Sequence, residues 1–129
     1  MHDQQRMPTI LVVEDDEEMN ELERELLAVH GFASVPAYDG RQAVELCRCT
    51  HADAVLLDVM LPKMDGYQAC SEMRRLLNGV PIIMISALGE EDSRKRGMAV
   101  GANAYFTKPF NPEEIVATLH RLINKECTC

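Results

Sequence analysis

The sequence predicts an α/β domain in which a parallel five-stranded sheet is covered by helices on both faces. Three continuous aliphatic runs, at 10–13, 54–57 and 82–85, suggest strands that are buried on both sides. Two weaker strand candidates, 33–37 and 104–107, are expected nearer the edges of the sheet. Amphipathic segments separate these five runs, and five successive strand–helix units favour a parallel sheet.

Apolar spacing and stop signals predict the first three helices. In the first helix, four apolar residues recur at helical spacing and are expected to form its buried stripe: Met19, Leu22, Leu26 and Val29. Gly31 is expected to end that helix. Two further helices are expected near 41–49 and 66–77.

The last helix has the clearest start. Asn111 can cap it, and Pro112 fits its first position. Its predicted buried stripe comprises Ile115, Leu119, Leu122 and Ile123.

The segment 90–100 predicts a helix of a different kind. Its first seven residues include no large apolar side chain, so little packing against the sheet is expected. Its charged residues can form three i,i+4 pairs, each worth about 0.2–0.5 kcal/mol: Glu90–Arg94, Glu91–Lys95 and Asp92–Arg96. We therefore expect this helix to be held loosely.

Length and composition indicate one globular domain of 129 residues, 47% apolar and 26% charged. We expect this domain to span 9–124, with tails at 1–8 and 125–129. No stretch approaches the roughly 20 apolar residues of a membrane span, and residues 1–8 lack the apolar segment of a secretory signal. A cytoplasmic location without a membrane partner is expected. The net charge of −8 argues against nucleic-acid binding by this segment, because such binding needs Lys and Arg.

The five cysteines do not form a recognisable framework. An odd number argues against a fully paired disulfide set. Cys47 and Cys49 are separated by one residue, as are Cys127 and Cys129, which is tighter than the usual zinc spacing. Reduced, mostly packed thiols are favoured over a metal or redox role.

Polar residues close four of the predicted strands. The first strand ends in Glu14-Asp15-Asp16, the third in Asp58, the fourth in Ser86, and the fifth runs into Lys108. Parallel strands place these groups on one edge of the sheet, where ligands of such sheets bind. For the acids at 14–16, the alternative is that they only cap the following helix.

Asp58 is the most informative of these residues. It directly follows a buried apolar run, where an Asp has no structural role. Two unit charges about 4 Å apart repel by roughly 4 kcal/mol at an effective dielectric constant near 20, so clustered carboxylates need a cation. Mg²⁺ fits, since it binds a few carboxylates together with waters and phosphate oxygens. Asp58 can then attack phosphorus as a nucleophile. Lys108 can neutralise charge on the transferred group, and Ser86 can hydrogen-bond it.

These residues also carry a family resemblance. The chain from about Thr9 to Asn124 resembles the receiver domain of bacterial two-component response regulators. The residues that carry the resemblance are Glu14-Asp15, Asp58, Leu61-Pro62-Lys63-Met64-Asp65-Gly66, Ser86-Ala87, and Tyr105 through Lys108-Pro109-Phe110. It implies a flavodoxin-like three-layer (βα)5 sandwich with strand order 2-1-3-4-5.

The resemblance also implies roles for individual residues. Asp58 would accept a phosphoryl group from the phosphohistidine of a sensor histidine kinase or phosphotransfer protein. The implied Mg²⁺ site comprises Glu14, Asp15, Asp58 and the backbone carbonyl of Met60. Ser86 would be the switch hydroxyl, Tyr105 the switch aromatic and Lys108 the phosphate partner. In the family the Lys108–Pro109 peptide is usually cis. For Tyr105 the alternative is an ordinary packed aromatic of an edge strand.

The resemblance further implies how the signal leaves the domain. If Ser86 moves to bind the phosphoryl group, it vacates space that Tyr105 can fill, and the helix at 90–100 responds. The face formed by the fourth helix, fifth strand and fifth helix would then signal to an output domain or downstream protein. The expected state is a monomer or a phosphorylation-dependent homodimer. Asn103 and Ala104 stand where one DNA-binding subfamily often carries acids used in dimer contacts, which argues against dimerisation through that face.

Two rival functions are weighed against the signalling switch. A phosphohydrolase with an aspartate nucleophile typically has a second Asp two residues later, where this chain has Met60. A pseudo-receiver that binds partners without phosphate would not need the complete set of acids, hydroxyl and amine. The domain is expected to catalyse only its own phosphorylation and slow dephosphorylation. The dephosphorylation is expected to be slow because Met60 and Leu88 are apolar and cannot easily position a water.

Overall fold

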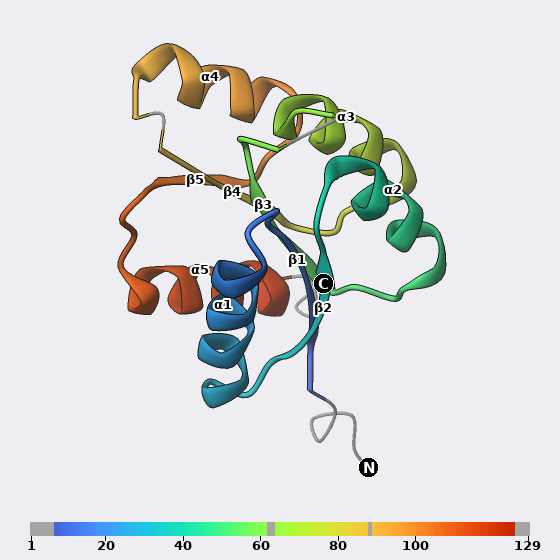
Figure 1. The fold of residues 1–129 in the computed structure, drawn as a ribbon, viewed down its shortest axis with the longest axis vertical. Helices are drawn as coiled ribbons and strands as arrows, with labels where there is room; N and C mark the ends of the chain where they lie inside the picture. The colour runs from blue at the N-terminus through green and yellow to red at the C-terminus, as the bar shows by residue number, and fades with distance from the viewer. Residues whose placement is uncertain (1–6, 62–63, 88, 126–129) are drawn as a thin grey trace.

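The computed structural model describes residues 7–61, 64–87 and 89–125. Strands and helices alternate along the chain (Figure 1). The strands are β1 Thr9–Val13, β2 Ala33–Ala37, β3 Ala54–Asp58, β4 Ile82–Ser86 and β5 Ala104–Thr107. The helices are α1 Glu17–Val29, α2 Gly40–Cys49, α3 Gly66–Leu76, α4 Glu91–Ala99 and α5 Pro112–Lys125. These bounds lie within two residues of the predicted ones.

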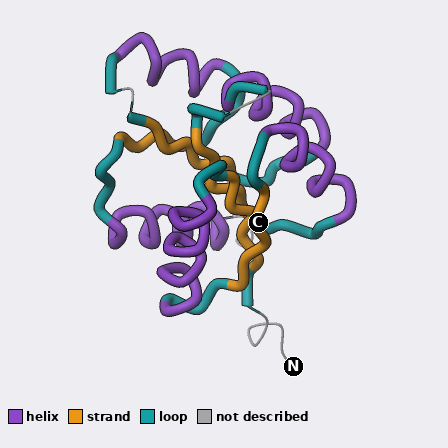
Figure 2. Tube along the Cα trace, viewed as in Figure 1, coloured by secondary structure: helices purple, strands orange, loops and turns teal. Residues whose placement is uncertain are grey.

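The five strands form one parallel sheet in the order β2-β1-β3-β4-β5. This confirms the predicted fold class and places the two weaker strands at the edges. Helices α2, α3 and α4 lie on one side of the sheet, and α1 and α5 lie on the other (Figures 1 and 2). The carboxyl ends of β1, β3 and β4 therefore meet at one edge.

Two apolar layers form the core, one on each face of the sheet. Successive residues of each buried strand point to opposite faces, so Leu11 and Val13 join one layer while Ile10 and Val12 join the other. The first layer packs against α2 and α3, and the second against α1 and α5. In α5, Ile115 and Leu119 are buried as predicted.

Aspartates begin three of the helices. The side chains of Asp16, Asp39 and Asp65 each accept a hydrogen bond from the backbone N–H three residues later. Such caps satisfy an amide that has no partner within the helix. After α1, Gly31 adopts a φ of 91°, a left-handed conformation that glycine tolerates at little cost.

Helix α4 is attached to the sheet by few apolar contacts. It has no side-chain cap, and Gly97 is its one buried residue. A Cβ at Gly97 would lie 2.8 Å from Met84 Sδ and 2.9 Å from the ring of Tyr105, so the helix backbone lies close against both. Among the described residues, none of the three predicted i,i+4 pairs in this segment forms an ion pair.

Arg74 connects α3 to the amino-terminal edge of the sheet. Its guanidinium donates to the carbonyls of Leu77, Val80 and Gly101. It also donates to Oδ1 of Asn103, which in turn accepts from the Ile82 N–H. Asn103 thus has a structural role, and the turn after α4 is fixed to α3. None of the described helices has the length and apolar character needed to cross a bilayer.

Candidate functional site

The three consecutive acids after β1 occupy different environments. Glu14 is buried, and its Oε2 accepts from the Asp16 N–H at 3.0 Å. Asp15 is exposed, while Asp16 caps α1 by accepting from the Met19 N–H at 3.2 Å. The alternative that these acids only cap the helix therefore applies to Asp16. The side chains of Glu14 and Asp15 remain available to form a site at the edge of the sheet.

Asp58 ends β3 and is buried beside these acids. Its Oδ1 accepts from the Met60 N–H at 3.0 Å, and its Oδ2 lies 3.1 Å from Lys108 Nζ. Lys108 Nζ also lies 3.2 Å from Glu14 Oε1, so one ammonium bridges two buried carboxylates. The cis peptide bond after Lys108, which the resemblance implied, is present.

Burial and charge shift the pKa values of these groups. Burial raises the pKa of Glu14, and the neighbouring Asp58 raises it further. Burial and the nearby Glu14 raise the pKa of Asp15. Burial lowers the pKa of Lys108, but Asp58 and Glu14 outweigh this effect, and the pKa is raised. Carboxyls whose pKa values are raised by close approach are stabilised as carboxylates by an added cation.

One carboxylate oxygen from each of Glu14, Asp15 and Asp58 lies within 4.8 Å of the others. Such a group of hard oxygen donors, open to solvent at Asp15, suits a divalent cation that keeps several waters. The structure thus brings together the residues that the sequence singled out as metal ligands. The backbone of Met60 adjoins them through its bond to Asp58.

The two residues predicted to act as a switch, Ser86 and Tyr105, lie on β4, the neighbour of β3, and on β5, the next strand of the sheet. Ser86 ends β4 and is buried. Tyr105 in β5 is also buried. Burial raises the pKa of Tyr105. Leu88, Pro62 and Lys63 lie outside the described residues.

The predicted buried stripe of α1 is wrong. Met19, Leu22 and Val29 are 41%, 58% and 82% exposed, respectively. The residues that α1 buries are Asn20, Glu23 and Leu27. Asn20 Nδ2 lies within 3.2 Å of three strand-end carbonyls, those of Val12, Glu14 and Ala37. These carbonyls, rather than apolar contacts alone, determine which side of α1 faces the sheet.

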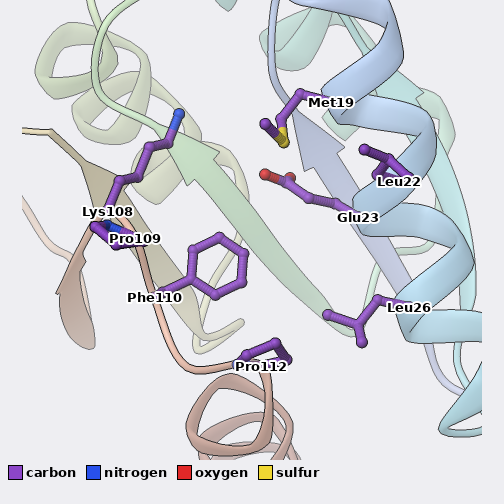
Figure 3. Close-up of a pocket in the computed structure, with 8 residues that line it drawn as sticks. All are labelled: Met19, Leu22, Glu23, Leu26, Lys108, Pro109, Phe110 and Pro112. Carbon is purple, nitrogen blue, oxygen red and sulfur yellow. The ribbon is translucent and has the colours of Figure 1, made fainter.

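The exposed side of α1 lines an apolar groove of about 490 Å³ (Figure 3). The opposite wall comes from the segment between β5 and α5, and the lining residues are Met19, Leu22, Glu23, Leu26, Lys108, Pro109, Phe110 and Pro112. Figure 3 shows the Glu23 carboxylate and the Lys108 side chain on opposite walls. The groove therefore adjoins the acidic pocket through Lys108.

Sequence reasoning missed Glu23. It is 5% exposed, and burial together with the charge of Glu14 raises its pKa to about 8. No sequence signal sets Glu23 apart from the other acids of α1, so only the rotation of α1 reveals its burial. For the cysteines, burial raises the pKa values of Cys47 and Cys70 to about 11, consistent with packed thiols, whereas Cys49 is exposed. Cys127 and Cys129 lie outside the described residues.

The fold and the pocket define a class: a flavodoxin-like α/β domain with an acidic, lysine-bridged site at the carboxyl edge of its sheet. Residues 10–120 match the family described as the response regulator receiver domain. The chain is 40% identical over 119 residues to the transcriptional regulatory protein CpxR of Klebsiella pneumoniae, covering 92% of this chain and 50% of that protein. It is 39% identical over 116 residues to the probable transcriptional regulator ycf27 of Cyanophora paradoxa, covering 90% and 48%.

The comparison with solved structures supports the same family. The receiver domain of the sensor histidine kinase PA1611 from Pseudomonas aeruginosa, with a magnesium ion coordinated in its active-site cleft, superposes with a TM-score of 0.84. It is 34% identical, and the match covers 92% of this chain and 99% of that domain. The chain belongs to the response regulator receiver domain family of two-component signalling systems. It spans about half the length of the curated relatives that it matches.

Proposed function

We propose that this domain accepts a phosphoryl group on Asp58 from the phosphohistidine of a sensor histidine kinase or phosphotransfer protein, with Mg²⁺ as cofactor. The observation that carries the proposal is the approach of Glu14, Asp15 and Asp58 to within 4.8 Å, with Lys108 Nζ 3.1 Å from Asp58. The domain would work in the cytoplasm and signal to an output domain or downstream protein. The proposed bounds are residues 9–124.

The residues around Asp58 suit nucleophilic attack by its carboxylate. An Asp58 oxygen would bond to phosphorus as the phosphorus–nitrogen bond breaks, and the imidazole would keep that electron pair and take a proton from solvent. Lys108 Nζ lies 3.1 Å from Asp58 Oδ2 and is placed to pair with a phosphoryl oxygen afterwards. Ser86 would donate its hydroxyl hydrogen to another phosphoryl oxygen.

Bound Mg²⁺ would neutralise charge on the transferred group. Glu14, Asp15, Asp58 and the Met60 carbonyl are the proposed residues around it. The chemistry of the donor set fits, because all of these donors are hard oxygens and the pKa values of Glu14 and Asp15 are raised. The magnesium-containing receiver domain of PA1611 supports the same assignment.

The apolar groove beside Lys108 is the proposed contact for the protein donor. The helices beside it carry exposed acids: Glu17, Glu18, Glu21 and Glu25 on α1, and Glu113 and Glu114 on α5. A donor helix that presents apolar side chains flanked by Lys and Arg would complement this surface. Its phosphohistidine would then lie near the acidic pocket.

Phosphorylation by a small donor tests the proposal. The protein is incubated with phosphoramidate and Mg²⁺, and its intact mass is measured. We expect a stable gain of one phosphoryl group in the wild type, none in Asp58→Asn, and a normal gain in Asp16→Asn, which removes a neighbouring charge but keeps a capping side chain. Catalytic turnover of the donor would instead indicate a phosphohydrolase, and no reaction would indicate a pseudo-receiver.

Slow loss of the phosphoryl group is a second expectation. The Met60 side chain is 58% exposed beside Asp58 and offers no strong hydrogen bond to an attacking water. We expect the label to persist for many minutes or longer, and Met60→Asn, with an amide that can hold water, to shorten this time. Loss of label within seconds from the wild type would contradict the expectation.

A further inference from the structure

The apolar groove beside α1 contains a buried acid that has no partner. Glu23 is 5% exposed, yet its carboxylate takes part in no hydrogen bond or ion pair among the described residues. Every fully buried side-chain nitrogen and oxygen atom in this part of the chain does have a partner, so the Glu23 oxygens must reach the surface of the groove. Figure 3 shows this carboxylate pointing away from α1, toward the wall that carries Lys108 and Phe110.

Lys108, on that opposite wall, does not supply the missing positive charge. Its Nζ lies 3.1 Å from Asp58 Oδ2 and 3.2 Å from Glu14 Oε1, so two other carboxylates already share this ammonium group. Burial and the charges of Glu14 and Asp58 raise the pKa of Glu23, and Lys108 offsets them only in part. An unpaired carboxylate in such a place is unfavourable, and a cation bound in the groove would stabilise it.

The walls of the groove indicate which kind of cation fits. Its volume of about 490 Å³ is in the range of small-molecule sites, and Met19, Leu22, Leu26 and Phe110 make its lining largely apolar. A metal ion would need several oxygen ligands, but Glu23 is the one acid among the lining residues. A single carboxylate between apolar walls suits an organic ammonium ion that carries an apolar body.

We propose that this groove is a binding site for a small primary amine with an apolar body. The ammonium group would pair with the Glu23 carboxylate, and the body would pack between α1 and the segment that joins β5 to α5. The net charge of −8 favours the approach of such a ligand. A bound amine would cover the surface proposed to contact the phosphoryl donor and would compete with its docking. The site itself requires neither Mg²⁺ nor phosphorylation.

Titration with phenethylamine, followed by two-dimensional NMR, tests the site. The measurement is made without Mg²⁺ at pH 8.5, where the amine is protonated and most of the Glu23 carboxyl is ionised. Phenethyl alcohol, similar in shape but uncharged, is the matched probe. The wild type should bind the amine with a Kd on the order of 1 mM and the alcohol about tenfold more weakly. The largest shift changes should fall on the amides of Leu22, Leu26 and Phe110.

Two variants decide whether Glu23 holds the amine. Glu23→Gln should weaken amine binding by about tenfold or more and change alcohol binding by less than about twofold. Glu25→Gln removes the same charge from an exposed position of α1 and should leave the affinity for both probes within about twofold of wild type. Because Glu23→Gln removes an unpaired charge, it should fold at least as stably as the wild type, and loss of binding would not reflect unfolding.

Three results would overturn the proposal: no saturable binding of the amine, equal affinity of the wild type for amine and alcohol, or undiminished amine binding by Glu23→Gln. Shift changes centred on Asp58 and Met60 instead of Leu22 would place the amine in the acidic pocket and would overturn it as well. None of these results bears on the phosphorylation of Asp58 by phosphoramidate, so the failure of this inference and of the proposed function are distinguishable.

Discussion

Helices α1 and α4 lie on opposite faces of the sheet (Figure 1), and they are attached in contrasting ways. Helix α1 has an aspartate cap, a buried Leu27 and an asparagine that bonds three strand carbonyls. Helix α4 has neither a side-chain cap nor a buried side chain larger than glycine. A firmly fixed helix can expose apolar residues for a partner without losing its position. A weakly fixed one is better suited to move.

The buried carboxyl of Glu23 offers the strongest way to test how firmly α1 is fixed. Its pKa in the folded protein is about 8, against about 4.5 when unfolded, so the folded state binds the proton more tightly. Below about pH 4.5 the Glu23 carboxyl is protonated in both states and does not lower the free energy of unfolding. As pH rises the unfolded state ionises first, so the folded state loses stability, and this loss is complete above about pH 8. Glu23→Gln should remove it, raising the free energy of unfolding over wild type by up to about 5 kcal/mol at high pH.

Urea unfolding without Mg²⁺ at pH 5, 7 and 8.5 measures this difference. Glu25→Gln, at an exposed position of the same helix, is the control and should differ from wild type by less than about 0.5 kcal/mol at every pH. A Glu23→Gln effect that does not grow with pH would show that the carboxyl is well solvated and that α1 is less tightly packed than described.

A charge in the groove tests the proposed use of the exposed side of α1. Leu22→Asp should slow transfer from a phosphohistidine donor protein by about tenfold, since it places an unpaired charge in an apolar contact. Phosphorylation by phosphoramidate should be unchanged. Leu76→Asp, at a residue of α3 that is 42% exposed, is the control and should affect neither rate. Equal slowing with both donors would mean that Leu22 acts on the acidic pocket rather than on docking.

A methyl group at Gly97 tests the attachment of α4. Alanine favours helix by about 1 kcal/mol over glycine, but overpacking typically costs about 1–3 kcal/mol. Because the new Cβ would lie 2.9 Å from the rigid ring of Tyr105, we expect Gly97→Ala to lower the free energy of unfolding by about 1 kcal/mol. Urea unfolding measures it, with Lys95→Ala as an exposed control. Stabilisation by Gly97→Ala would show that α4 does not pack closely on the sheet.

The sequence predicted the sheet and the acidic pocket well because both depend on local signals. Continuous apolar runs identify β1, β3 and β4, and parallel pairing then brings the residues that follow them to one edge. Glu14, Asp58 and Lys108 meet for this reason, although Lys108 lies 94 residues from Glu14 and 50 from Asp58.

The orientation of α1 could not be predicted in the same way. Periodicity alone gives the stripe Met19, Leu22 and Leu26, and an apolar stripe usually faces the core. The rotation is instead decided by Asn20, whose amide reaches carbonyls where two strands end. These carbonyls come together only when the two strands pair in the folded protein.

The bonds of Arg74 give α4 two unlike ends. Its carboxyl end runs into Gly101, whose carbonyl accepts two hydrogen bonds from the guanidinium, at 3.2 and 2.7 Å. Its amino end is held by two single hydrogen bonds, from the Tyr67 hydroxyl to the Ser93 carbonyl at 3.2 Å and from the Arg94 guanidinium to the Tyr105 carbonyl at 3.5 Å. With nine residues at about 1.5 Å each, the helix is about 13 Å long, and the end near Arg74 is the more firmly attached. A tilt about that end would displace the Glu91 end of the helix most, and Glu91 is exposed to a partner.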